Sequence, residues 1–543
     1  MKALVEAALV GTARQPDRAQ NALAGDMPVD ALVAALDEGV GVERRVLLAA
    51  ALHDTYERAG RVPRAGVDLV PPAGSETAPH CAPAVTALLG DLLAIRPRVL
   101  LAEALARLSG AGMIVTPALL PDLLDTHDPS LASVLPRVIG ERGRWLAALV
   151  GGDDWLIAGV LDPAEARRVW EEAPFPRRLA VLRERRHADP ADALGWVAAS
   201  WAAESAEHRA QILGVVGETL VPDDAAFLEQ ALGDRSANVR AAAARLLARL
   251  PGSDAAQRFA ARADAMLAYE APSARGLLGR MQKAVGLESA GTLAVHPPEQ
   301  WDAAWERDGI AAKPPKGLGE RAYWLTEALA LVAPERWAQR FGTEPRTLIR
   351  AALKSEWAIP VLQGWSQAAV TVGDQPWAAA LWDAWLDDVK PGDASARLES
   401  SARGAAMMAL HRVLSAADAE ARALAMMRRT PVELPIGLAV LVHVVPAPWS
   451  VEHSRRFLAE LAPLLATAAA ATQWTPGTWF ESLEPVAMRL APAAFPDALA
   501  LERDLTSVDT LPPAYRRKLE EFRDVVRLRQ RIHEEIPGEP TRR

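Results

Sequence analysis

The sequence predicts an all-α protein built from stacked helices, and three observations support this fold class. Strong helix formers dominate the 543 residues, which include 110 alanines and 53 arginines. Apolar residues recur at spacings of three and four, as they do along one face of a helix. Strand signals are nearly absent, because no Asn-Gly hairpin turn occurs and alternating β-branched runs are few.

The first predicted region, residues 1–150, is helical and carries a Pro-rich loop. Apolar residues repeat with helical spacing in three segments before the loop, at residues 3–10, 29–36 and 42–59. The loop covers residues 60–83, where five prolines and three glycines interrupt any regular period. Helical structure is expected to resume at residue 84.

The second region, residues 151–253, contains an internal repeat. Arg178, Arg209 and Arg240 are evenly spaced along the chain, and each lies near the start of an Ala- and Leu-rich helix. A shorter helical piece precedes each of them, at residues 166–172, 193–201 and 225–232. One such unit cannot bury its own apolar face, so tandem units are expected to stack on each other.

The clearest unit covers residues 222–253 and resembles a HEAT repeat. Its first helix is followed by an acidic turn at residues 233–236 and by a second helix at residues 238–250. In this interpretation Asp234 caps the second helix or pairs with an arginine of the next layer. The prediction is therefore a HEAT-like α-solenoid core with flanking helical domains. An irregular helical bundle with chance spacing is the alternative.

Two further regions complete the chain. Residues 254–320 are predicted to connect the repeats to the second half through a helix at 254–269 and a loop-rich linker. Residues 321–543 form a C-terminal, Trp-rich helical region, because twelve of the 17 tryptophans follow residue 300. Its helices are expected at residues 321–332, 345–354, 377–389, 396–414, 417–427, 453–471 and 513–536.

No residue pattern identifies a catalytic, cofactor-binding or metal-binding site. Neither a phosphate-binding loop nor a G-x-S-x-G elbow occurs, and no pair among the ten histidines has the i, i+4 spacing of helical metal ligands. Cys81 is the single cysteine, which excludes internal disulfides and thiolate clusters. The sequence therefore favours a protein without a cofactor and without enzymatic activity. A hydrolase whose site is assembled from scattered residues remains open.

The net charge of the chain argues against a protein that binds nucleic acid over much of its surface. The net charge is −9, and residues 160–253 carry 12 arginines against 14 acidic residues. The densest basic cluster nevertheless gives three candidate partner-binding residues, Arg178, Arg183 and Arg186.

Tryptophan supplies the other candidates. Trp377, Trp382 and Trp385 crowd one predicted helix, and tryptophan is enriched at the energetic centres of protein interfaces. We therefore take these three as candidate partner-binding residues, with a role in the core as the alternative.

Several short motifs resemble those of an uncharacterised bacterial family of large α-helical domains of unknown function. They are Leu-Val-Gly-Thr at 9–12, Ile-Gly-Glu-Arg-Gly-Arg-Trp-Leu at 139–146, Arg-Asp-Gly-Ile at 307–310 and Pro-Pro-Lys-Gly-Leu-Gly-Glu-Arg-Ala-Tyr-Trp-Leu at 314–325. Genes of that family often neighbour those of MoxR-type AAA+ ATPases, von Willebrand A-domain proteins and SWIM zinc-finger proteins. The resemblance implies a scaffold or adaptor working with such an ATPase, and it supplies no catalytic residues.

Together these patterns predict a cytoplasmic, non-enzymatic protein-interaction scaffold or adaptor. Its expected partners are proteins, with a AAA+ ATPase or an A-domain protein implied by the resemblance, and no membrane segment is expected because no apolar run approaches ~20 residues. The alternative is a helical-repeat protein that binds nucleic acid, including the base-excision type of enzyme. Partner identity, binding face, oligomeric state and regulatory ligand lie beyond the sequence.

Overall fold

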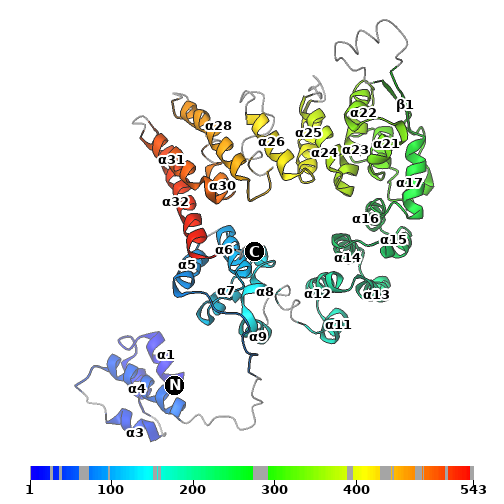
Figure 1. The fold of residues 1–543 in the computed structure, drawn as a ribbon. Helices are drawn as coiled ribbons and strands as arrows, with labels where there is room; N and C mark the ends of the chain where they lie inside the picture. The colour runs from blue at the N-terminus through cyan, green and yellow to red at the C-terminus, as the bar shows by residue number, and fades with distance from the viewer. Residues whose placement is uncertain are drawn as a thin grey trace. The chain divides into compact units, whose positions relative to one another are not determined.

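The structure is a computed structural model that describes most of the chain. The described residues are 2–24, 28–35, 39–59, 72–95, 98–150, 156, 161–272, 291–387, 396–427, 442, 445–470, 480, 482–507 and 511–538. The chain divides into two compact units, residues 1–72 and 73–543 (Figure 1). Helices account for 71% of the structure and strands for 2%, which confirms the predicted all-α class.

The first unit is a small group of helices around an alanine-rich core. The helices are α1 (Lys2–Val10), α2 (Pro16–Asn21), α3 (Pro28–Ala34) and α4 (Val42–Ala59). The unit ends within the predicted Pro-rich loop at 60–83, and the apolar side chains that follow the loop belong to a different core. The predicted region 1–150 therefore spans parts of both units. Residues 60–71 of the loop lie outside the described part of the chain.

The second unit begins with short helices that share their core with the C-terminal helix. They are α5 (Pro83–Leu93), α6 (Val99–Gly110), α7 (Leu120–Leu124), α8 (Leu135–Val138) and α9 (Gly140–Val150). The long C-terminal helix, α32 (Pro513–Glu535), contacts α5, and its Ile532 joins the same buried cluster as Leu101 and Leu105. Residues 73–150 are therefore held by the far end of the chain.

An ion-pair cluster joins α6 to α32. The Glu103 carboxylate accepts hydrogen bonds from Nε and one terminal nitrogen of Arg529, at 2.8 Å each, and from His533 at 2.9 Å. Burial by itself would raise the pKa of Glu103, but the hydrogen bonds from His533 and Arg529 lower it to about 2. The carboxylate therefore stays ionised between two donors from the opposite end of the chain.

The motif at residues 139–146 forms the start of α9. Its two glycines do not interrupt the helix, which is continuous from Gly140 to Val150. Gly140 has a φ of +66°, and the Glu76 carboxylate accepts hydrogen bonds from the backbone N–H groups of Glu141 and Arg142 at 2.8 and 2.9 Å. The glycine thus makes room for a carboxylate that caps the helix N-terminus.

Three consecutive pairs of helices follow, where the sequence predicts the repeat. They are α11 (Pro163–Glu172) with α12 (Phe175–Ala188), α13 (Pro190–Ser200) with α14 (Ala206–Glu218), and α15 (Ala225–Ala231) with α16 (Ala237–Leu247). Helix α12 contacts α14, and α14 contacts α16, so the second helix of each pair packs against the second helix of the next. All six helices lie where the sequence predicts them, with boundaries that differ by a few positions.

The next segment departs from its predicted structure. The helix expected at residues 254–269 ends at Asp264 as α17 (Asp254–Asp264), and the chain continues as β1 (Leu267–Glu270). Strand β1 pairs antiparallel with β2 (Thr292–Val295), in the register Leu267 to Val295. Local apolar spacing does not reveal this short sheet, because each strand depends on a hydrogen-bonding partner that is distant in the sequence.

The motif at residues 307–310 packs against the last of the paired helices, and the motif at residues 314–325 follows it. Asp308 is buried and accepts hydrogen bonds from Arg258 and Arg262 of α17, while the indole of Trp324 donates to the carbonyl of Ala312 at 3.1 Å. Gly309 has a φ of +81°, and a Cβ there would lie 2.7 Å from the Cα of Ala241. These residues therefore have structural roles in closing the core.

The remaining described helices form the C-terminal region. They are α19 (Ala303–Arg307), α20 (Glu320–Ala330), α21 (Glu335–Phe341), α22 (Pro345–Ala352), α23 (Ala358–Val372), α24 (Gln375–Asp387), α25 (Ala396–His411), α26 (Ala416–Met427), α28 (Val451–Ala470), α30 (Leu483–Ala487), α31 (Phe495–Thr506) and α32. Among the described residues there is no helix long and apolar enough to cross a membrane.

Candidate interaction groove between the helical layers

A ladder of arginines ties the second helix of each pair to a backbone carbonyl of the segment before it. Arg178 on α12 donates through Nε to the Trp170 carbonyl at 2.8 Å. Arg209 on α14 donates to the Glu204 carbonyl at 2.6 Å, and Arg240 on α16 donates to the Asp234 carbonyl at 2.8 Å. The evenly spaced arginines therefore make contacts of one kind, although the acceptor carbonyls lie eight, five and six residues before them.

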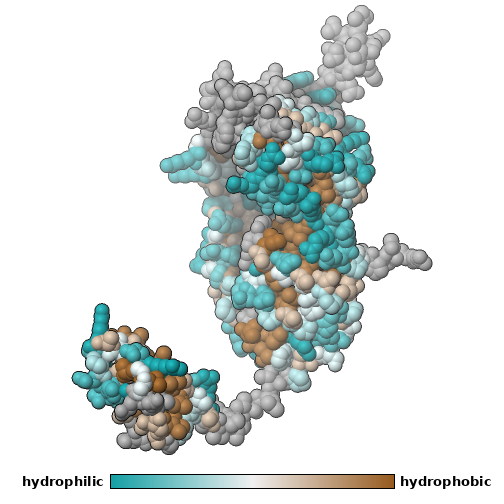
Figure 2. Space-filling view, turned by 90° about the vertical axis from the view of Figure 1, so that its left-hand side faces the viewer, coloured by the Kyte–Doolittle hydropathy of each residue, from teal (hydrophilic) through white to brown (hydrophobic). Residues whose placement is uncertain are grey.

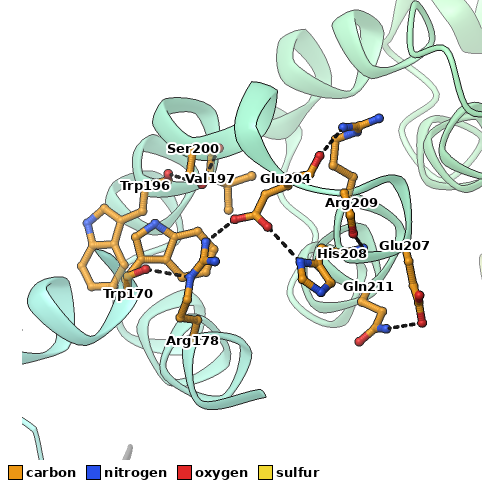
Figure 3. A network of polar contacts seen from close by, with 11 residues as sticks. Trp170, Arg178, Trp196, Val197, Ser200, Glu204, Glu207, His208, Arg209 and Gln211 are labelled. Carbon is orange, nitrogen blue, oxygen red and sulfur yellow. Dashed lines mark hydrogen bonds and ion pairs between the residues drawn. The ribbon is translucent and has the colours of Figure 1, made fainter. Parts of the chain in front are cut away.

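Each arginine of the ladder also pairs with a carboxylate that lies beyond its own layer. Arg178 pairs with Glu204, which precedes α14 (Figure 3). Arg209 pairs with Asp234, which precedes α16, at 2.7 Å. Arg240 continues the series by pairing with Glu306 at 3.0 Å.

Asp234 fulfils neither of its two predicted roles as stated. It pairs with an arginine, but Arg209 belongs to the preceding layer and not to the next one. Its carboxylate also accepts from the backbone N–H of Ser236 at 2.8 Å, but Ser236 is the residue before α16 and not part of the helix. Asp234 therefore orders the turn that leads into α16 and does not cap the helix itself.

Arg186 forms the most buried ion pair between layers. Its two terminal nitrogens donate to the two carboxylate oxygens of Asp224 at 2.9 and 2.8 Å, and the two side chains are 0% and 1% exposed. It also donates to the carbonyls of Pro190 and Thr219 at 3.0 and 2.7 Å. This bidentate geometry lets a guanidinium and a carboxylate be buried together, so Arg186 has a structural role in the interior.

The other two candidate arginines are also paired. Arg178 is mostly buried and lies over the Trp170 ring, with its guanidinium carbon 4.7 Å from the ring centre (Figure 3). Arg183 is 43% exposed and pairs with Glu218 at 2.8 and 3.1 Å. Of the three predicted partner-binding arginines, Arg183 alone has a substantially exposed side chain.

The three candidate tryptophans lie in the core. Trp377, Trp382 and Trp385 on α24 are at most 2% exposed. The Trp377 ring packs edge-on against Trp365 at 5.1 Å, and the Trp385 indole donates to the Ser366 hydroxyl at 3.0 Å. The alternative role that the sequence left open, a large aromatic in the core, describes their position.

A surface groove of about 480 Å³ lies beside the ladder, between α14 and α16. Six residues line it: Ala206, Glu207, Ala210, Gln211, Ser236 and Asn238. Ala206 and Ala210 are small, and Gln211 donates to Glu207 at 3.5 Å (Figure 3). Its polar side chains are thus two amides, one hydroxyl and one carboxylate, with no basic residue.

This set of side chains suits an extended peptide. A primary amide offers a donor and an acceptor together, which matches the N–H and C=O groups of a peptide backbone. The small alanines allow a chain to approach, and the exposed Glu207 carboxylate favours a basic group on the ligand. The groove therefore has the chemistry of a polar peptide-docking site.

The repeat itself carries a signal for this groove. The step from Glu207 to Asn238 equals the step from Arg209 to Arg240, so the two groove residues occupy equivalent positions in consecutive layers. Asn238 is also one of only two asparagines in the chain. When consecutive layers of the repeat are aligned, Glu207 and Asn238 fall at equivalent exposed positions on one face.

Titratable groups with displaced pKa values lie away from the groove. Burial raises the pKa of Glu327 on α20, although Arg245 opposes that shift, and burial lowers the pKa of His411 on α25 to about 4. His453 on α28 also has a lowered pKa because of burial, against the opposing charge of Glu420. Within the described ranges, no three His, Cys, Asp or Glu side chains are placed to hold a metal ion.

Comparison with known proteins gives one family. The family model described as "Family of unknown function (DUF5691)" matches residues 3–536, which is nearly the whole chain. No curated protein and no solved structure matches the chain.

Proposed function

The chain belongs to this family of unknown function, and we propose that it is a non-enzymatic scaffold that binds protein partners. The observation that carries the proposal is the groove between α14 and α16, with its two amides and one carboxylate. We assign α11 to α16 to a HEAT-like α-solenoid, which uses its layered surface for binding. The regular contacts of Arg178, Arg209 and Arg240 support this assignment.

The arginine ladder suits a scaffold because it holds the two walls of the groove in fixed positions. Arg209 is buried and holds Asp234, and Asp234 in turn orders the turn before the helix that carries Asn238. Arg209 itself lies on α14, two positions after Glu207. Opposite walls of the groove are thereby joined through one ion pair, which keeps their spacing constant and lowers the entropy lost when a peptide binds.

The proposed ligand is an extended peptide segment with at least one basic residue. It comes from a protein partner in the cytoplasm, and the resemblance to a family encoded beside AAA+ ATPase and von Willebrand A-domain genes makes those the partners to test. The nucleic-acid alternative has less support, since the ladder arginines and Arg186 are already paired with carboxylates.

The test is site-specific photocrosslinking with the full-length chain in lysate of its native host. A photoreactive residue at position 238, in the groove, is expected to give adducts with a small set of proteins, including the ATPase or A-domain partner. The same residue at Gln230, which is exposed on α15 and outside the groove, serves as the control and should give none of these adducts.

A binding measurement separates the alternatives. Gln211→Ala and Glu207→Gln should weaken capture of the crosslinked partner, whereas Gln230→Ala should leave it unchanged. Capture that is equal in all variants would contradict the groove as the binding site. Tight, salt-sensitive binding of DNA by a preparation without protein partners would instead favour the nucleic-acid alternative.

A further inference from the structure

Helix α32 joins two separate cores of the second unit. Leu519 and Val526 on its first half belong to the large core that begins at α11. Ile532, near its end, and Ile536, just after it, belong instead to the core of α5 to α9. Among the described residues, the other buried members of this smaller core all come from residues 81–156. The α5–α9 segment therefore builds most of its core itself and receives the end of α32 along one side.

Two side chains of α6 contact the end of α32 in different ways. Glu103 and Arg107 are one turn apart, so they lie on the same face of α6. Glu103 accepts hydrogen bonds from the side chains of Arg529 and His533. Arg107 donates to the carbonyl of Ile536 at 2.8 Å, at the end of the helix, where the last carbonyls have no partner within it. This face of α6 therefore recognises basic side chains together with the carbonyl end of one helix.

Each side of this contact keeps its position without the other. Arg529 also donates to the carbonyls of Ala487 and Leu490 at 2.6 and 2.8 Å, so it retains two hydrogen bonds on its own side when Glu103 moves away. Glu103 lies on α6, and Leu101 anchors that helix in the core of α5 to α9. Separation of the two helices therefore leaves the surfaces on both sides formed.

Water reaches the polar part of the contact. The side chains of Glu103 and His533 are 22% and 20% exposed. Those of the interior ion pair between Arg186 and Asp224 are 0% and 1% exposed. Figure 2 shows the side of the second unit where α31 and α32 lie, and hydrophilic and hydrophobic groups both reach the surface there. Motion between two parts of a chain is expected unless their interface is large and apolar, and this one is small and partly polar.

We propose that α6 carries a binding site for the C-terminal end of a basic amphipathic helix, and that the chain's own α32 occupies this site until a protein partner with such a helix displaces it. Ile532 and Ile536 supply the apolar contact, one turn apart, and Arg529 and His533 supply the basic groups. The partner helix is expected to share the pattern Arg-x-x-Ile-His-x-x-Ile at its end. The site shares no residue with the groove between α14 and α16, so the two proposals stand or fall separately.

The test measures whether a peptide can replace the end of α32. The probe is a fluorescein-labelled peptide with the sequence of residues 524–538, and its binding is followed by fluorescence anisotropy. The full-length chain should bind this peptide weakly, because its own α32 fills the site. The full-length variant Ile536→Ala should bind it at least about tenfold more tightly, since the internal competitor has lost one of its two buried isoleucines.

Matched changes identify the contacts of the peptide. A peptide with Arg529→Ala should bind the Ile536→Ala chain about tenfold more weakly than the unchanged peptide. A peptide with Arg527→Ala loses the same charge at a position that is exposed in α32, and its affinity should be unchanged. Addition of Glu103→Gln to the Ile536→Ala chain should abolish the gain in affinity.

A second variant of the chain covers the case in which Ile536→Ala loses helical circular dichroism. His533→Ala removes one hydrogen bond to Glu103 but leaves both isoleucines in place, and it should raise the affinity for the peptide about threefold. Equal binding by the unchanged chain and both variants, or equal binding of the Arg527→Ala and Arg529→Ala peptides, would overturn the proposal. So would a dimer in light scattering that Ile536→Ala dissociates, because α32 would then occupy the site of a second copy.

Discussion

Helices α11 to α16 and helices α20 to α25 join their layers by different chemistry. The first group uses arginine–carboxylate pairs that repeat along the chain, with Arg186 and Asp224 the most buried of them. The second group packs indoles against each other, with Trp365, Trp377 and Trp385 almost completely buried. Five of the six candidate partner-binding residues of the sequence belong to these two packing systems, and Arg183 stays exposed.

The difference shows how to interpret clusters of one residue type. The arginine cluster of α12 resembles a basic patch in the sequence, because its carboxylate partners lie far along the chain and are invisible locally. The tryptophan cluster of α24 resembles an interface for the same reason, since α22, α23 and α25 cover it. In both regions a long-range partner turns a surface candidate into part of the interior.

The largest expected effect breaks the ionic packing of the first region. Arg186→Ala leaves Asp224 buried without its partner and should lower the free energy of unfolding by about 3–5 kcal/mol, measured by chemical denaturation. The double variant Arg186→Met/Asp224→Leu should recover most of that loss, because it removes both charges. If the double variant does not recover stability, the ion pair contributes more to the free energy of unfolding than the neutralisation of each charge by the other.

Acid should act selectively on the second region through His411. This side chain is 4% exposed and neither ring nitrogen has a hydrogen-bond partner within the described part of the chain, and burial lowers its pKa from 6.5 to about 4. Above pH 6.5 it is neutral in both states, and below that value the unfolded chain binds a proton that the folded chain resists. Stability should therefore fall by about 3 kcal/mol between pH 6.5 and 4, measured by denaturation at each pH.

The matched variants are His411→Leu and His187→Leu. The first should flatten the fall in this pH window, while the second replaces an exposed histidine and should leave the fall as it is. An unchanged pH profile in His411→Leu would assign the acid sensitivity to other groups.

A single hydroxyl tests whether the indole packing also depends on polar contacts. Ser366 accepts the Trp385 indole proton at 3.0 Å and donates to the Leu362 carbonyl at 2.6 Å, all in the interior. Ser366→Ala leaves a buried indole N–H without an acceptor and should cost about 1–3 kcal/mol. Trp337, whose buried indole nitrogen already lacks a partner among the described residues, shows that the fold tolerates such a group, so a loss near zero would place Trp385 in the same class.

The smallest effect is expected at the exposed pair of the first region. Arg183→Ala removes an ion pair whose side chains are 43% and 41% exposed, and it should change stability by only about 0.2–1 kcal/mol. The same denaturation measurement made beside Arg186→Ala gives the ratio between an exposed and a buried pair in one helix. A loss of stability as large as that of Arg186→Ala would contradict the expectation that an exposed ion pair stabilises the fold less than a buried one.

Local patterns predicted the helices of the paired layers well but did not predict α23 or α31, and they predicted the contacts between helices poorly. The six helices of the paired layers followed from apolar periodicity and helix propensity, which depend on neighbouring residues. The even spacing of Arg178, Arg209 and Arg240 was read directly from the sequence. The short sheet of β1 and β2 did not, because its pairing needs a partner distant in sequence. The groove was partly predictable from the sequence, because Glu207 and Asn238 occupy equivalent positions in the repeat.

By itself, the sequence determined that the chain is helical, that its arginines recur with a regular interval and that they are balanced by acids. Helix formation and repeat spacing are properties of the order of the residues, so they are visible without the fold. Only the tertiary structure decided which arginine meets which carboxylate, which tryptophans are covered and where Glu103 finds Arg529. Those outcomes depend on contacts between distant segments, which form only when the helices pack.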